Sequence, residues 1–295
     1  MIFIEVIGGL GNQMFQYALY EKLKRCYGKD EVRLHIGRFK EIRDNNGYEL
    51  ERVFSVKEGE DFSPIVMQLI DDKMDLFTRV RRKLFGFKRS YFMEGEDLSF
   101  KKNILSLKLD KDIYLRGLWQ SEYYFKDIRQ ELLNIFEFES IEDDENKRIL
   151  DLMRKSNSVS IHIRRGDYIN NSIYQEMLGG VCDTNYYNQA IAKIEEIIDA
   201  PHFFVFSDDI NWARESLPIL RQHMVEYIDW NKGLKSHIDM QLMSCCKNNI
   251  IANSTFSWWG AWLNQNENKV VIAPKIWFKT KKVNRDIIPK EWIKI

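Results

Sequence analysis

The pattern of apolar and polar residues in the second half of the chain predicts strands that alternate with helices. The predicted strands are 158–163, 203–206, 249–252 and 270–272. The predicted helices are 185–198, 239–245 and 257–264. Such alternation predicts a parallel, doubly wound sheet. Ligands of these sheets bind beyond the carboxyl ends of the strands, so the residues there are the first candidates for chemistry.

The first half of the chain opens with a strand, a glycine turn and a helix. Residues 2–7 are apolar except for Glu5, glycines follow, and residues 13–25 have a helical pattern. Residues 113–118 predict another strand, and an aromatic-rich segment follows at 119–125. We therefore expect α/β structure in this half as well.

The length of the chain predicts two domains, because its 295 residues exceed the roughly 100 to 200 residues of a single domain. The acidic segment 139–146 is the best position for a hinge or helix start between them. We expect an N-terminal lobe at 1–143, a C-terminal lobe at 144–295 and a cleft between the lobes.

Composition and charge narrow the class of protein. Hydrophobic residues make up 44% and charged residues 30% of the chain, which is typical of a globular protein. The 44 basic and 44 acidic residues cancel, which argues against nucleic acid as a partner. The N-terminus lacks the regions of a signal peptide, and no apolar run approaches the ~18 residues of a spanning helix. We expect a cytoplasmic protein without a transmembrane segment.

The cysteines give no indication of a metal site or a disulfide framework. Cys26, Cys182, Cys245 and Cys246 have no CxxC spacing, and the adjacent pair is poorly placed to bond to itself. This pattern favours reduced, buried thiols.

A basic segment, Arg79 to Arg89 (RVRRKLFGFKR), has two interpretations. The first is a solvated helix face. The second is peripheral contact with an anionic membrane surface or a lipid-linked acceptor. Both stay open on the sequence.

The end of the strand at 158–163 carries a concentration of charge. Strand alternation buries Ile161 and Ile163 on one face and places His162 and Arg164 on the other, and Arg165 follows in the turn. Two arginines and a histidine beside a glycine would form a cationic cup that suits a diphosphate. The alternative is a salt bridge between an arginine and Asp167 that only fixes the turn.

The strand at 203–206 ends at Asp208 and Asp209. These carboxylates would bind Mg or Mn with a nucleotide diphosphate, or accept hydrogen bonds from a purine edge or a ribose. The third interpretation is that they cap the following helix.

The third strand end leads into a helix through small polar residues. Asn253, Ser254, Thr255 and Ser257 lie where free N–H groups and the positive end of a helix dipole would bind phosphate. Ordinary helix capping is the alternative. For Trp258 and Trp259, core packing is favoured over stacking on a sugar.

The glycine turn after the first strand does not match the dinucleotide motif GxGxxG. Gly9 and its neighbours instead indicate that a ligand passes close to the backbone. Asn12 and Gln13 are available there to hydrogen-bond that ligand.

Six blocks together resemble the alpha-1,2-fucosyltransferases of glycosyltransferase family eleven. They are GGLGNQMFQYA at 8–18, NGYEL at 46–50, HIRRGDY at 162–168, FSDD at 206–209, DMQLMSCC at 239–246 and NSTFSWWGAWLN at 253–264. The resemblance implies a GT-B-like architecture of two Rossmann-type lobes. It also implies GDP-beta-L-fucose as donor, inversion to an alpha-1,2-fucoside, and activity without a metal or other cofactor.

The resemblance further implies roles for individual residues. It places Arg164 and its neighbour Arg165 at the diphosphate of the donor and His162 beside the nucleotide. Asp208 and residues 253–257 would complete the GDP pocket. The N-terminal glycine loop would face the cleft and help to hold the fucose or the acceptor, which is an oligosaccharide or a glycolipid.

Cleavage of the fucose–phosphate bond develops negative charge on GDP, so a fixed cation at the diphosphate stabilises the transition state. Arg164 is the candidate for this role. Inversion also needs a base near the acceptor hydroxyl, for which Asp167 and Glu176 are candidates. A metal-dependent transferase using Asp208 and Asp209, and a carbohydrate-binding protein without catalysis, are the competing interpretations.

Overall fold

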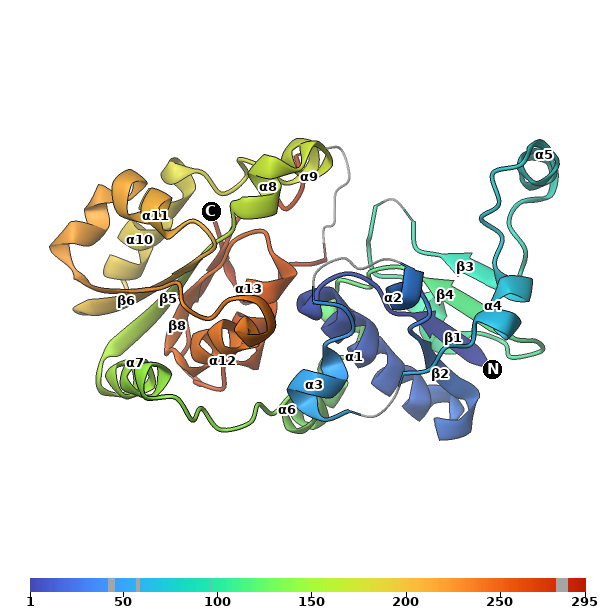
Figure 1. Cartoon of the computed structure of the whole chain (residues 1–295), viewed down its shortest axis with the longest axis horizontal. Coiled ribbons are helices and arrows are strands. Elements are labelled where there is room, and N and C mark those ends of the chain that lie inside the picture. The colour runs from blue at the N-terminus through green and yellow to red at the C-terminus, as the bar shows by residue number, and fades with distance from the viewer. Residues whose placement is uncertain (42–45, 57–58, 96, 280–285) are drawn as a thin grey trace. The chain divides into compact units, whose positions relative to one another are not determined.

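The computed structural model describes residues 1–41, 46–56, 59–95, 97–279 and 286–295 (Figure 1). The chain folds into two compact units, Met1–Glu137 and Phe138–Ile295, so the division falls next to the acidic segment. Each unit has its own sheet, and every strand pairing within the two sheets is parallel. In the described ranges, no helix is both long enough and apolar enough to cross a bilayer.

The first unit contains a four-stranded sheet in the order β2-β1-β4-β3. Its strands are β1 Ile2–Glu5, β2 Val32–His35, β3 Tyr91–Met93 and β4 Ile113–Arg116. Its α-helices are α1 Leu10–Tyr27, α2 Arg38–Glu41, α3 Leu50–Phe54, α4 Ser63–Leu69, α5 Leu76–Phe85 and α6 Arg129–Ile135. On one face of the sheet, Phe3 and Tyr114 pack against Val66 of α4.

The strand, glycine turn and helix expected at the N-terminus are present. Gly8 has a φ of +80°, and a β-carbon there would lie 2.7 Å from the side chain of Asn12. A non-glycine residue would therefore be strained and would clash at this turn. Helix α1 begins at Leu10, and its apolar side buries residues such as Phe15 and Leu19.

The second unit contains a six-stranded sheet in the order β10-β9-β8-β5-β6-β7. Its strands are β5 Asn157–Ile163, β6 Pro201–Ser207, β7 Met224–Ile228, β8 Asn248–Ile250, β9 Val271–Ala273 and β10 Ile293–Lys294. Its α-helices are α7 Asp144–Lys155, α8 Gly166–Asn170, α9 Ser172–Met177, α10 Thr184–Glu195, α11 Ile210–Ser216, α12 His237–Cys245 and α13 Thr255–Leu263. Helices cover both faces of this sheet, with α10 and α11 on one side and α7, α12 and α13 on the other (Figure 1).

The core of the second unit explains the alternation along β5. Ile161 and Ile163 are buried in the cluster that includes Tyr187 and Ile191 of α10. The expected inward face of the strand is therefore confirmed. The doubly wound arrangement with a parallel sheet is confirmed as well.

The thiols differ from the expectation of buried cysteines. Cys246 is buried, but Cys26 and Cys245 are exposed. Cys26 lies in the last turns of α1, on the side of the helix that does not face the core.

Candidate active site

Three neighbouring strands of the second unit bring the predicted site segments to one edge of the sheet. Strand β5 lies between β8 and β6, and the three run in the same direction. Their carboxyl ends therefore share one edge. Arg164 follows β5, Asp208 follows β6, and Ser254 lies between β8 and α13.

Asp208 fixes the turn that follows β5. Its Oδ1 accepts the backbone N–H of Arg165 at 2.9 Å, and its Oδ2 accepts the N–H of Gly166 at 3.0 Å. The same Oδ2 lies 3.0 Å from a terminal nitrogen of the Arg164 guanidinium. A β-carbon on Gly166 would lie 2.9 Å from this oxygen, so glycine permits the close approach.

These contacts change the interpretation of both aspartates. The carboxylate of Asp208 serves the turn and Arg164, so Asp208 supplies a salt bridge that fixes this turn. The salt bridge expected from Asp167 is not tested and stays a prediction. Asp209 caps α11 by accepting the N–H of Trp212 at 3.2 Å, which confirms capping for this residue. The side chain of Asp167 is outside the described part of the structure, although its backbone lies in α8.

The two arginines of the turn have different environments. The Nε of Arg165 is 3.1 Å from Asp209, and its guanidinium lies over the Trp212 ring at 4.2 Å from the centroid. Arg165 is therefore held against α11. The side chain of Arg164 keeps 35% of its surface exposed and is oriented by Asp208. Arg164 is thus the better placed of the two to meet a ligand at the strand edge.

His162 is a neutral group and not the cation that the sequence suggested. Burial, together with the positive charge of Arg164, lowers its pKa to about 3. The residue is 7% exposed, and its ring lies 5.7 Å from the ring of Phe256. Within the described ranges, Nδ1 of His162 has no hydrogen-bond partner. A neutral ring with an unused nitrogen can accept or donate one hydrogen bond to a ligand.

Side chains at the start of α13 hold the turn together. Asn253 donates hydrogen bonds to the carbonyl oxygens of Leu178 at 3.1 Å and Trp277 at 3.0 Å. The Ser257 hydroxyl lies 3.3 Å from the carbonyl oxygen of Ser254. The side chains of Asn253 and Ser257 are therefore occupied by backbone groups. The groups of this segment that are better placed to contact a ligand are its backbone N–H groups and the side chain of Thr255, which is half-buried.

Ser254 occupies the N-cap position of α13 and makes no side-chain capping hydrogen bond. The first turn of a helix has backbone N–H groups without partners inside the helix, and it carries a positive partial charge. Phe256, which contacts His162, lies in this first turn. The helix start, His162 and Arg164 thus form a polar edge that suits an anionic ligand.

The paired tryptophans of α13 belong to the core, as expected. Trp258 and Trp259 have no exposed surface. The indole N–H of Trp258 donates to the carbonyl oxygen of Ile287 at 2.6 Å. Trp119 and Tyr124 are also completely buried. The carbohydrate-binding interpretation depended on these four aromatic side chains and on Tyr123, and of the five only Tyr123 is not fully buried.

In the first unit, Gln13 is a structural residue, and its predicted contact with a ligand is wrong. Its side-chain N–H groups donate to the carbonyl oxygens of Gly8 and Gly47, both at 2.8 Å. Its side-chain oxygen accepts the N–H of Glu49 at 2.8 Å. Gln13 is completely buried, and both of its N–H groups and its oxygen bond to the backbone of the surrounding loops.

Gly9 and Asn12 remain accessible at the same turn. Gly9 occupies the N-cap position of α1, and both residues are half-buried. The side-chain oxygen of Asn12 accepts a hydrogen bond from Gln120 at 2.9 Å. The ligand contacts expected for Gly9 and Asn12 stay predictions.

Glu94 is a titratable residue that the sequence analysis missed. It follows β3, and its Oε2 accepts the N–H groups of Leu118 at 2.7 Å and Trp119 at 3.1 Å. Burial raises the pKa of Glu94, and the two hydrogen bonds lower it. The effect of burial is the larger, so the pKa is raised to about 7. The short strand β3 gave no clear sequence pattern, so the carboxylate at its end was not singled out.

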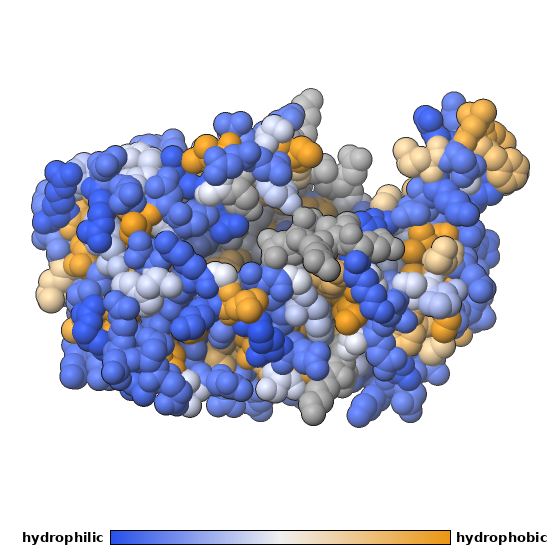
Figure 2. All heavy atoms as spheres, in the orientation of Figure 1, coloured by the Kyte–Doolittle hydropathy of each residue, from blue (hydrophilic) through white to orange (hydrophobic). Residues whose placement is uncertain are grey.

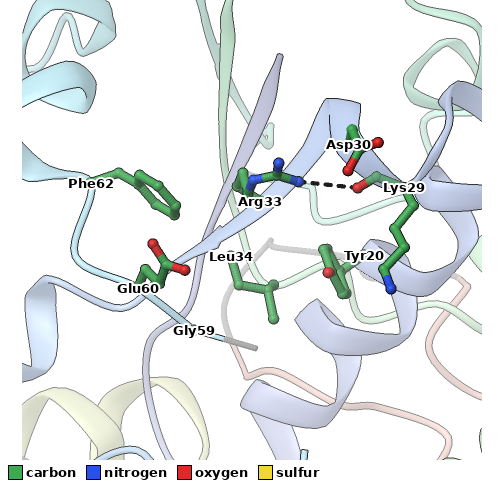
Figure 3. Close-up of a pocket in the computed structure, with 8 residues that line it drawn as sticks. All are labelled: Tyr20, Lys29, Asp30, Arg33, Leu34, Gly59, Glu60 and Phe62. Carbon is green, nitrogen blue, oxygen red and sulfur yellow. Dashed lines mark hydrogen bonds between the residues drawn. The ribbon is translucent and has the colours of Figure 1, made fainter. Parts of the chain in front are cut away.

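A cavity of about 270 Å³ lies elsewhere in the first unit (Figure 3). Tyr20 of α1 and Leu34 of β2 line it, together with residues 59, 60 and 62. Arg33 at its edge donates to the carbonyl oxygen of Lys29 at 3.1 Å. None of the predicted site residues lines this cavity.

Comparison with known proteins decides the family. The family model described as glycosyl transferase family 11 matches residues 83–295. The chain belongs to glycosyltransferase family 11. The family 11 chain is 34% identical to an alpha-1,2-colitosyltransferase of Escherichia coli, and the match covers 100% of this chain and 99% of that protein. This protein is therefore a glycosyltransferase, as the resemblance of the six blocks implied.

This family 11 enzyme is also similar to a mammalian fucosyltransferase in sequence and to a bacterial fucosyltransferase in fold. It is 29% identical to galactoside alpha-(1,2)-fucosyltransferase 2 of Bos taurus over 52% of this chain and 46% of that one. Its fold is similar to that of the fucosyltransferase NodZ from Bradyrhizobium, with a TM-score of 0.50 at 12% identity. That match covers 88% of this chain and 91% of NodZ. The GT-B-like α/β architecture, with a parallel sheet in each unit, is confirmed.

Proposed function

We propose that this enzyme transfers L-fucose from GDP-beta-L-fucose to the 2-hydroxyl of a terminal galactoside and inverts the anomeric centre. The observation that carries the proposal is the edge formed by Arg164, neutral His162 and the start of α13. Relatives named as alpha-1,2-fucosyl and alpha-1,2-colitosyl transferases support the sugar class and the linkage. We expect the enzyme to act in the cytoplasm.

In the proposed reaction, the 2-hydroxyl oxygen of the acceptor forms a bond to the anomeric carbon of fucose. The bond from this carbon to the phosphate oxygen breaks, and GDP leaves with the bonding electron pair. Arg164 stabilises the charge that develops on the diphosphate, aided by the N–H groups and the dipole at the start of α13. Asp208 acts through the turn, because it fixes the backbone at Arg165 and Gly166.

A base must take the proton of the acceptor hydroxyl in this displacement. We propose Asp167, the second residue of α8 directly after the arginine turn, for this role. Replacement by Asn tests it, because loss of turnover with unchanged GDP affinity is the expected result. Turnover at the wild-type level would exclude Asp167 as the base.

We propose that the second unit binds the donor and the first unit binds the acceptor. His162, Arg164 and Thr255 would contact GDP in the second unit. Gly9 and Asn12 would lie near the acceptor or the fucose. The acceptor would be an oligosaccharide or a glycolipid, and catalysis would need no metal ion.

GDP-colitose is the second candidate donor, because the relative that matches the whole chain is named as a colitosyltransferase. Colitose is fucose without its 3-hydroxyl group, so the two donors differ at one polar contact. A site built to bind that hydroxyl rejects the deoxy sugar strongly, whereas an apolar site discriminates weakly.

A product assay tests the proposal. The enzyme is incubated with GDP-fucose or GDP-colitose and with a panel of galactosides, with and without EDTA. NMR of the product determines the linkage and the anomeric configuration. We expect an alpha-1,2 product with GDP-fucose that forms equally well in EDTA. Transfer of colitose alone would assign the second donor, and loss of transfer in EDTA would contradict the metal-free mechanism.

A further inference from the structure

The basic segment noted in the sequence forms an arm whose helix stands away from the sheet of its own unit. Figure 1 shows α5 at the end of two extended connections, beyond α4 and β3. No residue of α5 is buried. The large apolar residues Leu76, Phe77, Leu84 and Phe85 are 76%, 79%, 68% and 80% exposed. We call residues 73–89 the arm.

Four of the five large apolar residues of α5 are arranged on one side of the helix, and Phe85 at its C-terminal end is the exception. Leu76, Phe77, Val80 and Leu84 have the i, i+1, i+4, i+8 spacing of a single helical face. In the space-filling view of Figure 2, hydrophobic atoms gather at the tip of this arm. Helix α5 is therefore amphipathic, and its apolar face has no protein cover within its own unit.

The base of the arm is firmly attached. Asp71 is 3% exposed, and its two oxygens accept hydrogen bonds from the Arg81 guanidinium. Asp71 also accepts the backbone N–H of Lys88 at 2.8 Å, and its carbonyl oxygen accepts from Arg82 at 2.7 Å. Burial alone would raise the pKa of Asp71, but these charged and backbone donors hold it below its usual value. The arm thus presents α5 in a defined position.

The charge of the arm is strongly positive, although the whole chain is neutral. Between Lys73 and Arg89 there are seven basic residues and one acidic residue, Asp75. Asp75 is the N-cap of α5 and accepts the N–H of Thr78. In the described part of the chain, no carboxylate lies within ion-pair distance of Arg79 or Lys83.

From these features we infer that the arm docks the enzyme on the surface of an anionic lipid bilayer. A short helix with exposed Phe and Leu on one face and Lys and Arg beside it is the form that lies in a membrane interface. A second copy of the chain is the less suitable occupant, because two arms of like charge repel one another. This inference goes beyond the transfer reaction and does not depend on the identity of the donor.

Vesicle co-sedimentation of the full-length enzyme tests the inference. We expect the protein to bind vesicles of phosphatidylcholine mixed with phosphatidylglycerol, to bind phosphatidylcholine alone poorly, and to dissociate as salt is raised. The double variant Arg79→Glu/Lys83→Glu should lower the partition coefficient at least about 30-fold, since each basic residue contributes about 1 kcal/mol. Phe77→Gln/Leu84→Gln should also lower it, because insertion of the apolar face is lost.

Two matched controls keep the test specific. Lys108→Glu reverses an exposed charge in the same unit, and Leu234→Gln removes an exposed apolar side chain from the second unit. Both should bind vesicles like the wild type, and all variants should keep the wild-type melting temperature. Equal binding to both vesicle types, no binding to either, or controls as weak as the arm variants would overturn the inference. The mass of the enzyme in solution tests for a second copy as the occupant. A wild-type dimer that becomes a monomer in Phe77→Gln/Leu84→Gln would assign the arm to self-association instead.

Discussion

At the scale of single residues, Asp208 organises the proposed donor site without needing to contact the donor. One carboxylate binds two backbone N–H groups and the Arg164 guanidinium, all within 3.0 Å. Hydrogen bonds to a charged group are stronger than those between neutral groups. The geometry of Arg164 therefore depends on the charge of Asp208.

Replacement of Asp208 by Asn tests this dependence. An amide keeps the size of the side chain, but it lacks the charge and can accept only one of the two N–H groups well. We expect kcat/KM for the donor to fall about 30-fold, which corresponds to about 2 kcal/mol. Asp151→Asn, at an exposed site of α7, is the control. Equal kinetics of the two variants would show that Asp208 does not position Arg164.

Glu94 predicts a pH-dependent stability. Its pKa is raised from 4.5 to about 7, so the folded protein binds the proton more tightly than the unfolded chain. This stabilisation is complete below about pH 4.5 and is lost as the pH rises through about 7. Glu94→Gln, which removes the charge, should raise the free energy of unfolding at about pH 8 by up to about 3 kcal/mol.

Chemical denaturation at about pH 8 and about pH 4 measures this effect. At the lower pH, Glu94→Gln and the wild type should be equally stable, because the wild-type carboxyl is protonated in the folded state. Glu137→Gln, at an exposed position, should have no effect at either pH. Destabilisation by Glu94→Gln at about pH 8 would mean that the ionised carboxylate is the form the fold requires.

Sequence reasoning identified the residues at the strand ends but not their partners. His162, Arg164 and Asp208 all lie at the edge where they were expected. That Asp208 holds the turn after β5 follows from the adjacency of β5 and β6, which the local pattern does not contain. The neutral state of His162 depends on burial near Phe256, which again needs the folded chain.

At the scale of elements, the junction of β1 and α1 shows why Gln13 was misjudged. A polar residue after a glycine turn looks available, but α1 directs Gln13 inward to three backbone groups of the turn and of residues 47 and 49. Gln13→Leu leaves these groups buried without partners, and we expect a loss of about 3 kcal/mol in the free energy of unfolding.

Denaturant titration of Gln13→Leu and Asn12→Ala separates stability from ligand binding. Asn12 is half-buried, so Asn12→Ala should change the free energy of unfolding by less than about 1 kcal/mol and raise KM for the acceptor. If Gln13→Leu were as stable as the wild type, the structural role of Gln13 would be wrong.

The strands of the second unit were the most predictable elements. Strands β5, β6, β8 and β9 are almost completely buried, as central parallel strands are, and each overlaps a range that the sequence predicted. Strand β7 was missed because it lies at the sheet edge, where Met224 is 68% exposed and the apolar pattern is weak. Strand β3 also lies at the edge of its sheet, and Met93 in it is 49% exposed, so its three residues lack the buried apolar pattern of β8 and β9.

At the scale of the whole molecule, the two parallel-sheet units and the family assignment agree with a glycosyltransferase of GT-B-like fold. The proposed catalysis uses the fixed Arg164 guanidinium and a helix dipole. EDTA should therefore change turnover with GDP-fucose less than about twofold. If EDTA abolished turnover and added Mg or Mn restored it, the result would instead indicate that Asp208 or Asp209 takes part in a metal site.

The most direct test of the central claim is the kcat/KM for GDP-fucose of Arg164→Ala compared with Arg148→Ala. Arg148 is also in the second unit, but it forms an exposed ion pair with Glu226 away from the strand edge. Arg164→Ala should lose about 2.7 to 4 kcal/mol of transition-state stabilisation, which is a fall of about 10²- to 10³-fold, and it should unfold like the wild type. Arg148→Ala should retain full activity. Wild-type activity in Arg164→Ala would contradict the assignment of this strand edge as the donor site.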